Sequence, residues 1–267
     1  MDNNSESFPP LMVRTCDIRE DGVFIHGYPQ TEICGNLTYT KTLFLTCRAR
    51  LPTTAETKVL DAVLNGMIGY GYWSVARAVA SANPKPFPAF MATFLAGGDY
   101  TIFPQHGAEE IQRWLQLMRD HNLTLNETAQ RIVAEYDASK RRMPGIGHPK
   151  FTRIDPRSQA VRDVAEKHGF ISDITLLYEA VHRAYTERPS RQNLCINIDG
   201  RFACTLLELG FEPPETTIIA MLSLAPGVLA DIMEQLKQKP SLQLMVGLPS
   251  EYVGEAERHL PEEYIRD

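Results

Sequence analysis

The segment TTAETKVLDAVL occupies residues 53–64 and opens with Thr53, which Glu56 follows three positions later. This Thr-x-x-Glu spacing is typical of a capping box, in which the two side chains satisfy backbone amides at a helix start. The apolar residues behind it recur every three or four positions, as one face of a helix requires; they are Val59, Leu60, Val63 and Leu64. The segment predicts an amphipathic α-helix.

Similar signals continue toward the C-terminus. Thr124 and Glu127 form a second capping box, and Asp155 followed by Pro156 combines a helix cap with proline at the first helical position. Apolar residues at helical spacing mark further helices around residues 111–118, 176–184, 206–209, 215–221 and 228–236. The fold class is therefore expected to be mostly α.

Strand signals are confined to one early stretch. Residues Gly22 to Tyr28 predict a short hairpin or a single edge strand. Because strands do not alternate with helices, and no G-x-G-x-x-G or Walker run occurs, the sequence argues against a nucleotide-binding α/β sheet. Clusters of proline and glycine are expected to be loops; they lie at residues 84–88, 97–98, 144–149, 213–214 and 226–227.

The composition is that of an ordinary globular chain. Its 267 residues allow one large domain or two small ones, and 43% apolar with 22% charged residues fit neither disorder nor a membrane protein. No uncharged apolar run reaches the roughly 18 residues of a membrane span, and the first residues lack a signal-peptide pattern, so we expect a cytoplasmic protein without membrane contact. The net charge of -6 argues against a nucleic-acid partner.

The five cysteines are odd in number and contain no C-x-x-C pair. This pattern argues against a zinc knuckle and against a complete disulfide framework, and no metal site is expected. The cysteines are interpreted as small buried apolar side chains.

A basic turn is the most informative feature of the sequence. The run Lys140-Arg141-Arg142 leads into Pro144-Gly-Ile-Gly-His148, whose two glycines allow backbone amides to approach a ligand closely. These residues indicate an anion site with a titratable group; a solvated basic helix end with a glycine stop is the alternative. Further on, Arg157 lies on the first turn of a predicted helix, where a guanidinium fork suits a carboxylate.

Two other residues are candidates for chemistry. Asp199, in the run Asn197-Ile198-Asp199-Gly200, follows an apolar stretch, so we expect a partly buried carboxylate that acts as a stronger base; an ordinary helix cap is the alternative. His106, in the run Gln105-His106-Gly107-Ala108, lies at the expected start of the helix that carries Trp114. Capping or packing is the alternative role of this histidine.

Together these runs resemble the citrate synthase superfamily. QHGA at 105–108 matches the family's H-G-G-A position, PGIGH at 144–148 with DPR at 155–157 matches its most specific signature, and NIDG at 197–200 matches its N-V-D motif. Residues 33–52, which include GNLTYTKTLFLTCRARLP, resemble an early family segment. The runs LLELGFEPPE at 206–215 and SLAPGVLADIMEQL at 223–236 resemble the short members, which include citryl-CoA lyases. The resemblance therefore covers most of the chain.

The resemblance implies a role for each matching residue. Asp199 is similar to the base that removes a proton from the carbon next to an acyl-CoA thioester, and His106 to the group that hydrogen-bonds the thioester oxygen as it becomes an enolate. His148 resembles the residue that polarises the carbonyl of a second substrate, and Arg157 resembles an arginine that grips its carboxylate. Preorganised donors and a carboxylate base suit such a weak carbon acid, and no metal is required.

The coenzyme A thioester is the substrate that the family implies. By the same resemblance, the cations Lys140, Arg141 and Arg142 border its site, as do the turn residues Gly145, Ile146 and Gly147. We also expect a homodimer, because members of the superfamily pair through antiparallel helices.

Several family positions differ in this chain. Leu224 stands where a carboxylate-binding arginine is usual, Gly66-Met67-Ile68 lacks the family's histidine, and Leu248-Pro249-Ser250 lacks an arginine. A substrate with fewer charges is therefore favoured. Arg201 or Arg191 is expected to replace a lost arginine, with a surface position as the alternative. Four large apolar or aromatic residues lie close together in the sequence, and they either line an altered acyl pocket or pack in the core. They are Met67, Tyr70, Tyr72 and Trp73.

These residues lead to one architecture and three functional hypotheses. A large helical domain is expected over residues 1–106 and 206–267, interrupted by a smaller helical domain over residues 107–205 that closes over the ligands. The first hypothesis is Claisen-type condensation, or the reverse carbon-carbon cleavage, between an acyl-CoA such as acetyl-CoA and an atypical oxo acid or other carbonyl compound. The alternatives are a CoA-thioester hydrolase and a catalytically silent protein that binds CoA or a protein partner.

Overall fold

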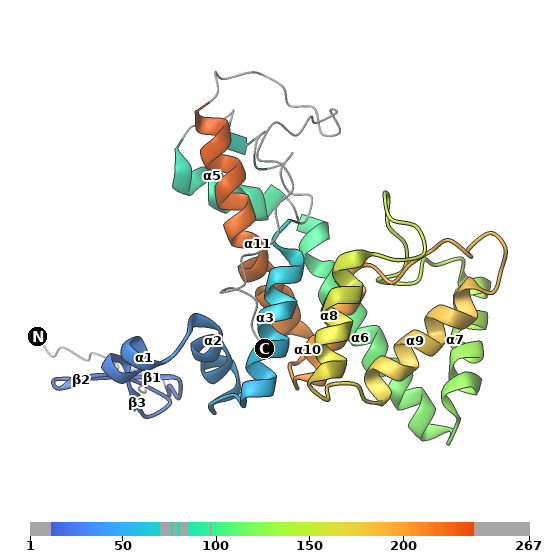
Figure 1. Cartoon of the computed structure of the whole chain (residues 1–267), viewed down its shortest axis with the longest axis horizontal. Coiled ribbons are helices and arrows are strands. Elements are labelled where there is room, and N and C mark those ends of the chain that lie inside the picture. The colour runs from blue at the N-terminus through green and yellow to red at the C-terminus, as the bar shows by residue number, and fades with distance from the viewer. Residues whose placement is uncertain (1–11, 70–75, 77–78, 81–84, 97, 238–267) are drawn as a thin grey trace, which may run out of the picture.

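A small antiparallel sheet precedes the helices (Figure 1). The computed structural model describes residues 12–69, 76, 79–80, 85–96 and 98–237. In this part of the chain the strands run in the order β1 (Cys16–Arg19), β2 (Gly22–Ile25) and β3 (Tyr28–Pro29), with Cys16 opposite Ile25 and Phe24 opposite Pro29. The strand expected around residues 22–28 is thus the middle of a tight meander.

Helices make up most of the rest, which confirms the expected mostly α fold. The described helices are α1 (Gln30–Asn36), α2 (Tyr39–Arg48), α3 (Thr54–Met67), α5 (Pro86–Ala96), α6 (Gly98–Asp120), α7 (Leu125–Ser139), α8 (Pro156–Lys167), α9 (Asp173–Thr186), α10 (Ile198–Glu208) and α11 (Pro213–Leu236). In Figure 1, α7 and α9 lie at one end of the molecule, and the sheet with α1 lies at the other.

The helix starts predicted from short-range signals are confirmed. Thr53 accepts a hydrogen bond from the amide of Glu56 at 3.1 Å, and the Glu56 carboxylate accepts one from the amide of Thr53 at 2.7 Å. The same box joins Thr124 and Glu127 at the start of α7. These bonds satisfy amides that have no partner within the helix.

Several local predictions are wrong. Loops were expected at residues 84–88, 97–98 and 213–214, but residues 86–88 lie in α5, Gly98 begins α6, and Pro213 and Pro214 begin α11. Proline is tolerated in the first turn of a helix, where its missing N–H is not needed.

Pro226 and Gly227 lie inside α11, and the QHGA run lies inside α6, where a helix start was expected. The reason for Gly227 is a close approach between helices, because a Cβ atom there would lie 2.2 Å from the carbonyl oxygen of Ile68 at the end of α3. Tertiary packing thus sustains α11 through a proline that breaks isolated helices.

The apolar core has two parts that meet at α10. One cluster joins α10 to α3 and α11 through residues such as Ile198 and Phe202, and the other joins it to α6, α7 and α9 through Ala203 and Cys204. Every residue from Ile198 to Leu207 is buried, as expected of a helix enclosed on all sides. The domain boundaries at residues 106 and 206 stay a prediction.

The expectation that the cysteines are buried holds for only two of the five. All five are free; Cys195 and Cys204 are buried, Cys16 and Cys47 are half-buried, and Cys34 is exposed. Cys34 lies on α1, a seven-residue helix in which only Ile33 is buried, so the small size of this unit leaves its other side chains at the surface.

Helix α11 is long and apolar enough to cross a membrane by length and composition alone. One of its faces packs into the core through Ile219, Leu224 and Val228. The opposite face is exposed and apolar; it includes Ile218, Leu222, Leu229 and Met233. The absence of membrane contact stays a prediction.

Candidate active site

The glycine turn packs directly against the segment that leads into α10. Ile146 and Ile196 form a β-bridge, the amide of Gly147 donates to the carbonyl of Cys195 at 2.7 Å, and the amide of Asn197 donates to the carbonyl of Gly145 at 2.9 Å. These bonds join two motifs that lie about fifty residues apart in the sequence. The PGIGH and NIDG runs therefore form one structural unit.

Two glycines permit this contact. A Cβ atom on Gly200 would lie 1.9 Å from the hydroxyl of Tyr178 and 2.7 Å from the carbonyl oxygen of Gly145. Gly145 has φ of +71°, and a Cβ atom there would lie 2.4 Å from Cα of Gly200. Both positions need glycine because the turn and α10 touch backbone to backbone. Gly145 of the turn thus serves packing. Contact of the turn with coenzyme A stays a prediction.

The start of α10 carries Asp199. Asn197 is the helix cap, because its side-chain oxygen accepts from the amide of Gly200 at 3.0 Å while its Nδ2 donates to the carbonyl of Gly147 at 2.8 Å. Asp199 lies in the first helical turn and is only 6% exposed. The cap considered for Asp199 is therefore made by Asn197.

His148 is held in one orientation by the backbone that follows it. Its Nδ1 accepts from the amides of Lys150 and Phe151, both at 3.0 Å, and its ring stacks on Phe151 with centroids 4.4 Å apart. Burial lowers the pKa of His148, and the Arg157 charge lowers it further. A neutral ring whose Nδ1 accepts carries its hydrogen on Nε2. His148 is thus a hydrogen-bond donor through Nε2.

Asp155 orients Arg157 beside this histidine. Its buried carboxylate accepts from Nε of Arg157 at 3.1 Å and from a terminal nitrogen of the same guanidinium at 2.8 Å. It also accepts from the amides of Arg157 and Ile198, each at 3.1 Å. Burial acts to raise the pKa of Asp155, but the bonds to Arg157 outweigh it and lower the pKa. Asp155, which the sequence indicated only as a cap, therefore also joins α8 to α10.

His148 and Arg157 together present two donors to one place. A terminal nitrogen of Arg157 lies 3.3 Å from Nε2 of His148. Because both atoms carry hydrogen, they do not satisfy each other, and a shared oxygen acceptor would satisfy both. The Arg157 side chain is 26% exposed, so this pair remains open to a ligand. Such a pair suits a carbonyl next to a carboxylate.

His106 lies on α6, which packs against α10. It is exposed, and its neighbour Gly107 packs on α10, where a Cβ atom on Gly107 would lie 3.3 Å from Cβ of Ala203. Ala203 is one helical turn beyond Asp199. The packing of α6 on α10 thus brings the His106 and Asp199 segments to a common junction.

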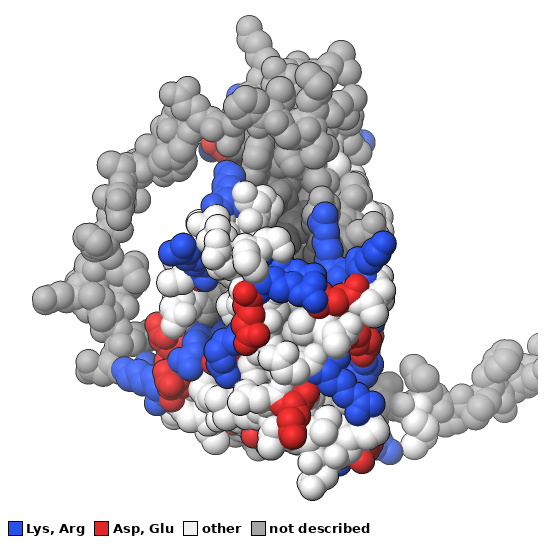
Figure 2. Space-filling view, turned by 90° about the vertical axis from the view of Figure 1, so that its right-hand side faces the viewer, with Lys and Arg blue, Asp and Glu red and all other residues white. Residues whose placement is uncertain are grey.

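The basic run that precedes the turn ends α7. Lys140 takes a left-handed conformation with φ of +55° as the C-cap, where the sequence alternative expected a glycine. Arg141 and Arg142 are exposed, and Arg141 donates to Glu135 at 2.8 Å. Figure 2 shows the end of the molecule that carries α7 and α9, with many Lys and Arg side chains interspersed with Asp and Glu. The role of these cations toward coenzyme A stays a prediction.

The two arginines considered as replacements have partners elsewhere. Arg201 is buried and donates to Glu179 on α9 at 3.0 Å. Arg191 donates to Asp137 at 2.7 Å and lies over the ring of Tyr185. Neither has a described contact with His148 or Arg157, so the structure does not join them to that pair. Substrate binding by Arg201 stays a prediction.

Two of the altered family positions lie on helices that pack together. Leu224 on α11 and Met67 on α3 are both buried in the same apolar cluster. Ser223 donates to the carbonyl of Leu64, and Gly227 touches Ile68, so the two helices are in direct contact there. Apolar side chains thus fill this junction. Tyr70, Tyr72, Trp73 and residues 248–250 lie outside the described residues.

The described residues contain no group of three or more histidine, cysteine, aspartate or glutamate side chains placed to hold a metal ion. The polar groups of the candidate site are hydrogen-bond donors and two buried carboxylates, Asp155 and Asp199. Such a set is suited to proton transfer and to oxygen atoms that develop negative charge.

Comparisons with known proteins identify the family of this chain. The family model "Citrate synthase, C-terminal domain" matches residues 74–244. "Probable citrate synthase, mitochondrial" of Leishmania braziliensis is 28% identical over 182 residues, which cover 61% of this chain and 37% of that protein. The chain therefore spans less than half the length of this curated relative.

Two solved structures share the fold. That of citryl-CoA lyase from Hydrogenobacter thermophilus aligns with a TM-score of 0.74 at 24% identity, covering 95% of this chain and 98% of that one. ATP citrate lyase from Methanothrix soehngenii, solved with citrate and coenzyme A, aligns with a TM-score of 0.72 at 17% identity, covering 92% of this chain and 43% of that one. The chain belongs to the citrate synthase family.

Proposed function

We propose that this protein acts on acyl-CoA thioesters by enolate chemistry, either forming a carbon-carbon bond to a carbonyl compound or breaking one. The observation that carries the proposal is the pair of donors on His148 and Arg157, which lie 3.3 Å apart and suit one oxygen-rich ligand. Family membership and the buried Asp199 at the neighbouring helix start support it.

Each residue has a defined task in the forward direction. The Asp199 carboxylate takes a proton from the carbon next to the thioester, and the electrons of the broken C–H bond move onto the thioester oxygen, where His106 donates a hydrogen bond. The enolate carbon then bonds to the carbonyl carbon of the second substrate. His148 donates to that carbonyl oxygen as it becomes an alkoxide, and Arg157 binds an adjacent carboxylate. The lyase direction reverses these steps.

The electrophile is proposed to carry fewer charges than citrate-forming substrates. Leu224 and Met67 are buried in an apolar cluster at positions where the family resemblance implies an arginine and a nearby histidine. A buried carboxylate without a cationic partner is costly, so a tricarboxylate product fits this junction poorly. An oxo acid with one carboxylate, or an aldehyde, fits it better.

Proton exchange tests the enolate step directly. The protein is incubated with acetyl-CoA in deuterated water and the methyl signal is followed by NMR. We expect exchange in the wild type and a loss of about 10²- to 10⁴-fold in Asp199→Asn, because the general base is removed. Asp163→Asn, an exposed change on α8, is the matched control and is expected to exchange at the wild-type rate.

Exchange in the wild type that is no faster than in Asp199→Asn would contradict enolate formation from acetyl-CoA, and longer acyl-CoAs would then be compared in the same way. A panel of oxo acids and aldehydes, read by mass spectrometry, identifies the condensed product. Release of free CoA without a condensed product would instead favour the hydrolase hypothesis, and binding of CoA without either reaction would favour the silent one.

We also propose that the protein is a homodimer. The exposed apolar face of α11 supports this, since four large apolar side chains at helical spacing form a stripe suited to burial against a second helix. Sedimentation velocity at micromolar concentration is expected to give the mass of two chains. A single-chain mass would contradict the proposal. The cytoplasmic location stays a prediction.

A further inference from the structure

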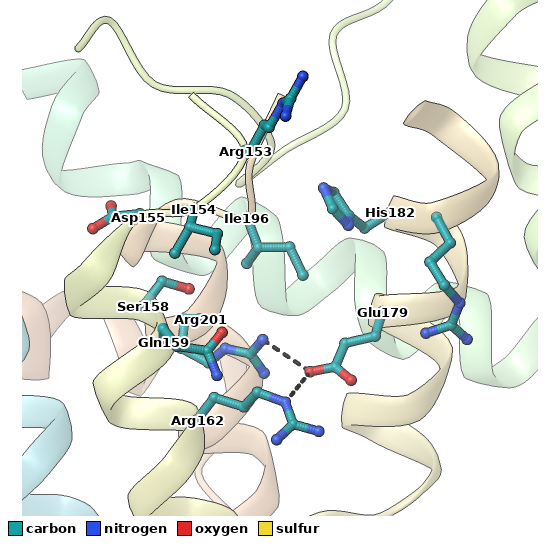
Figure 3. A pocket seen from close by; sticks show the side chains of 11 residues that line it. Arg153, Ile154, Asp155, Ser158, Gln159, Arg162, Glu179, His182, Ile196 and Arg201 are labelled. Carbon is teal, nitrogen blue, oxygen red and sulfur yellow. Dashed lines mark hydrogen bonds and ion pairs between the residues drawn. The ribbon is translucent and has the colours of Figure 1, made fainter. Parts of the chain in front are cut away.

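A polar cavity of about 230 Å³ lies between α8, α9 and the segment that enters α10 (Figure 3). Its lining carries four arginines and two carboxylates; they are Arg153, Arg162, Arg183 and Arg201 with Asp155 and Glu179. Asp155 is already matched by Arg157, which is not among the lining residues. Positive charge therefore exceeds negative charge in the cavity.

Arg201 is the most buried arginine of this cavity. The residue is only 3% exposed, and one terminal nitrogen donates to Glu179 at 3.0 Å. Its Nε is buried and meets no acceptor among the described residues. A buried donor without an acceptor is costly, and more so on a charged group. The guanidinium thus has one buried donor that lacks an acceptor among the described residues.

Glu179 is shared between two arginines. Its Oε1 accepts from Nε of Arg162 at 2.9 Å as well as from Arg201, and Figure 3 shows the two guanidinium groups converging on this carboxylate. Burial acts to raise the pKa of Glu179, but the two arginines outweigh it and lower the pKa. The other partner of Arg162 is Glu166, whose side chain is 60% exposed and whose charge is screened by water.

The size of the cavity and its groups define the ligand class. Pockets for drug-sized ligands usually measure about 300–1,000 Å³, so this cavity suits a smaller molecule. Guanidinium forks match the oxygen atoms of phosphate and carboxylate groups, and Ser158 adds a buried hydroxyl to the lining. The exposed Arg153 and Arg183 lie on the same lining and attract anions from solvent.

We propose that this cavity is a second anion site, separate from the thioester site, which binds a compact phosphate- or carboxylate-bearing molecule. Arg201 lies two residues after Asp199 on α10, and Arg162 lies five residues after Arg157 on α8. An anion held by both arginines bridges the two helices that carry the candidate active site. Its binding does not depend on the reaction proposed for that site.

Calorimetry with inorganic phosphate tests the site, with sodium chloride at equal ionic strength as the salt control and malonate as the carboxylate arm. We expect saturable binding in the wild type. Arg201→Gln and Arg162→Gln are each expected to weaken it about tenfold or more, because a hydrogen bond from a charged donor is lost. Arg131→Gln, an exposed arginine on α7 outside the cavity, removes the same charge and is expected to leave binding unchanged.

A repeat titration with the protein saturated by coenzyme A separates the two sites. Unchanged phosphate binding supports a second site, and competition with coenzyme A would overturn it. Circular dichroism checks that each variant is folded. Arg183→Gln provides a further test in case Arg201→Gln does not fold, because Arg183 is exposed and lines the cavity. This change is expected to weaken phosphate binding severalfold. Saturable binding of malonate alone would identify carboxylates as the ligand. The proposal would be contradicted if neither phosphate nor malonate showed saturable binding to the wild type. It would also be contradicted if Arg131→Gln weakened phosphate binding as much as Arg201→Gln does.

Discussion

Asp155 and Glu179 each form an ion pair with an arginine of α8, but the two carboxylates differ in how many partners they have and in how deeply they are buried. Asp155 takes two hydrogen bonds from one guanidinium and two more from backbone amides, and its side chain is fully buried. Glu179 divides one oxygen between Arg162 and Arg201 and remains 15% exposed. The first carboxylate is saturated by its own neighbourhood, whereas the second faces an excess of positive charge.

The two carboxylates therefore have different roles: Asp155 positions Arg157, and Glu179 lines the cavity proposed to bind an anion. Around Asp155 the bonds fix the start of α8 and the start of α10, and they hold Arg157 with a terminal nitrogen 3.3 Å from Nε2 of His148. Around Glu179 one donor of Arg201 still lacks an acceptor among the described residues. Asp155, whose oxygens accept four hydrogen bonds, positions the residues of the candidate active site. Glu179 is shared by two arginines, so the positive charge around it can attract a further anion.

The largest expected effect comes from removing the saturated carboxylate. Asp155→Ala takes away the cap of α8, the partner of Arg157 and the acceptor of the Ile198 amide. We expect the free energy of unfolding to fall by about 3–5 kcal/mol, as when one partner of a buried ion pair is lost. Urea unfolding followed by circular dichroism measures the change.

Asp163→Ala is the matched control for this change. Asp163 lies on the same helix, is exposed and accepts only a local bond from Gln159. Its removal is expected to alter the free energy of unfolding by no more than about 0.5 kcal/mol. If Asp155→Ala were equally mild, the view that Asp155 joins α8 to α10 would be wrong.

A smaller effect is expected from Glu179→Gln, which keeps a side-chain oxygen but removes the shared negative charge. The free energy of unfolding is expected to fall by about 1–3 kcal/mol, since two guanidinium groups lose a charged acceptor. Phosphate binding is expected to become tighter, because the cavity gains net positive charge. Urea unfolding and calorimetry measure the two effects.

Glu166→Gln provides the control on the other partner of Arg162. Its side chain is largely exposed, so both stability and phosphate affinity are expected to change little. Weaker phosphate binding in Glu179→Gln would show that the carboxylate helps to hold the ligand, and the contrast with Asp155 would then fail.

Local signals in the sequence predicted much of the fold. The capping boxes at Thr53 and Thr124 and the Asp155-Pro156 start depend on contacts within four residues, and these are the positions where prediction and structure agree. The exceptions include Pro226-Gly227 and QHGA, which predict a loop and a helix start but lie inside helices. At Gly227 a contact with Ile68 on α3 outweighs the local breaking signal.

The candidate site was predictable as a set of residue types but not as a geometry. The sequence by itself determined that two glycines, a histidine, an arginine and an aspartate stand at family spacing. Only the tertiary structure decided that Asp155 also bonds to α10 and that Arg201 pairs with Glu179. The physical reason is range: a cap is settled within one helical turn, whereas the partner of a buried charge depends on which helices pack beside it.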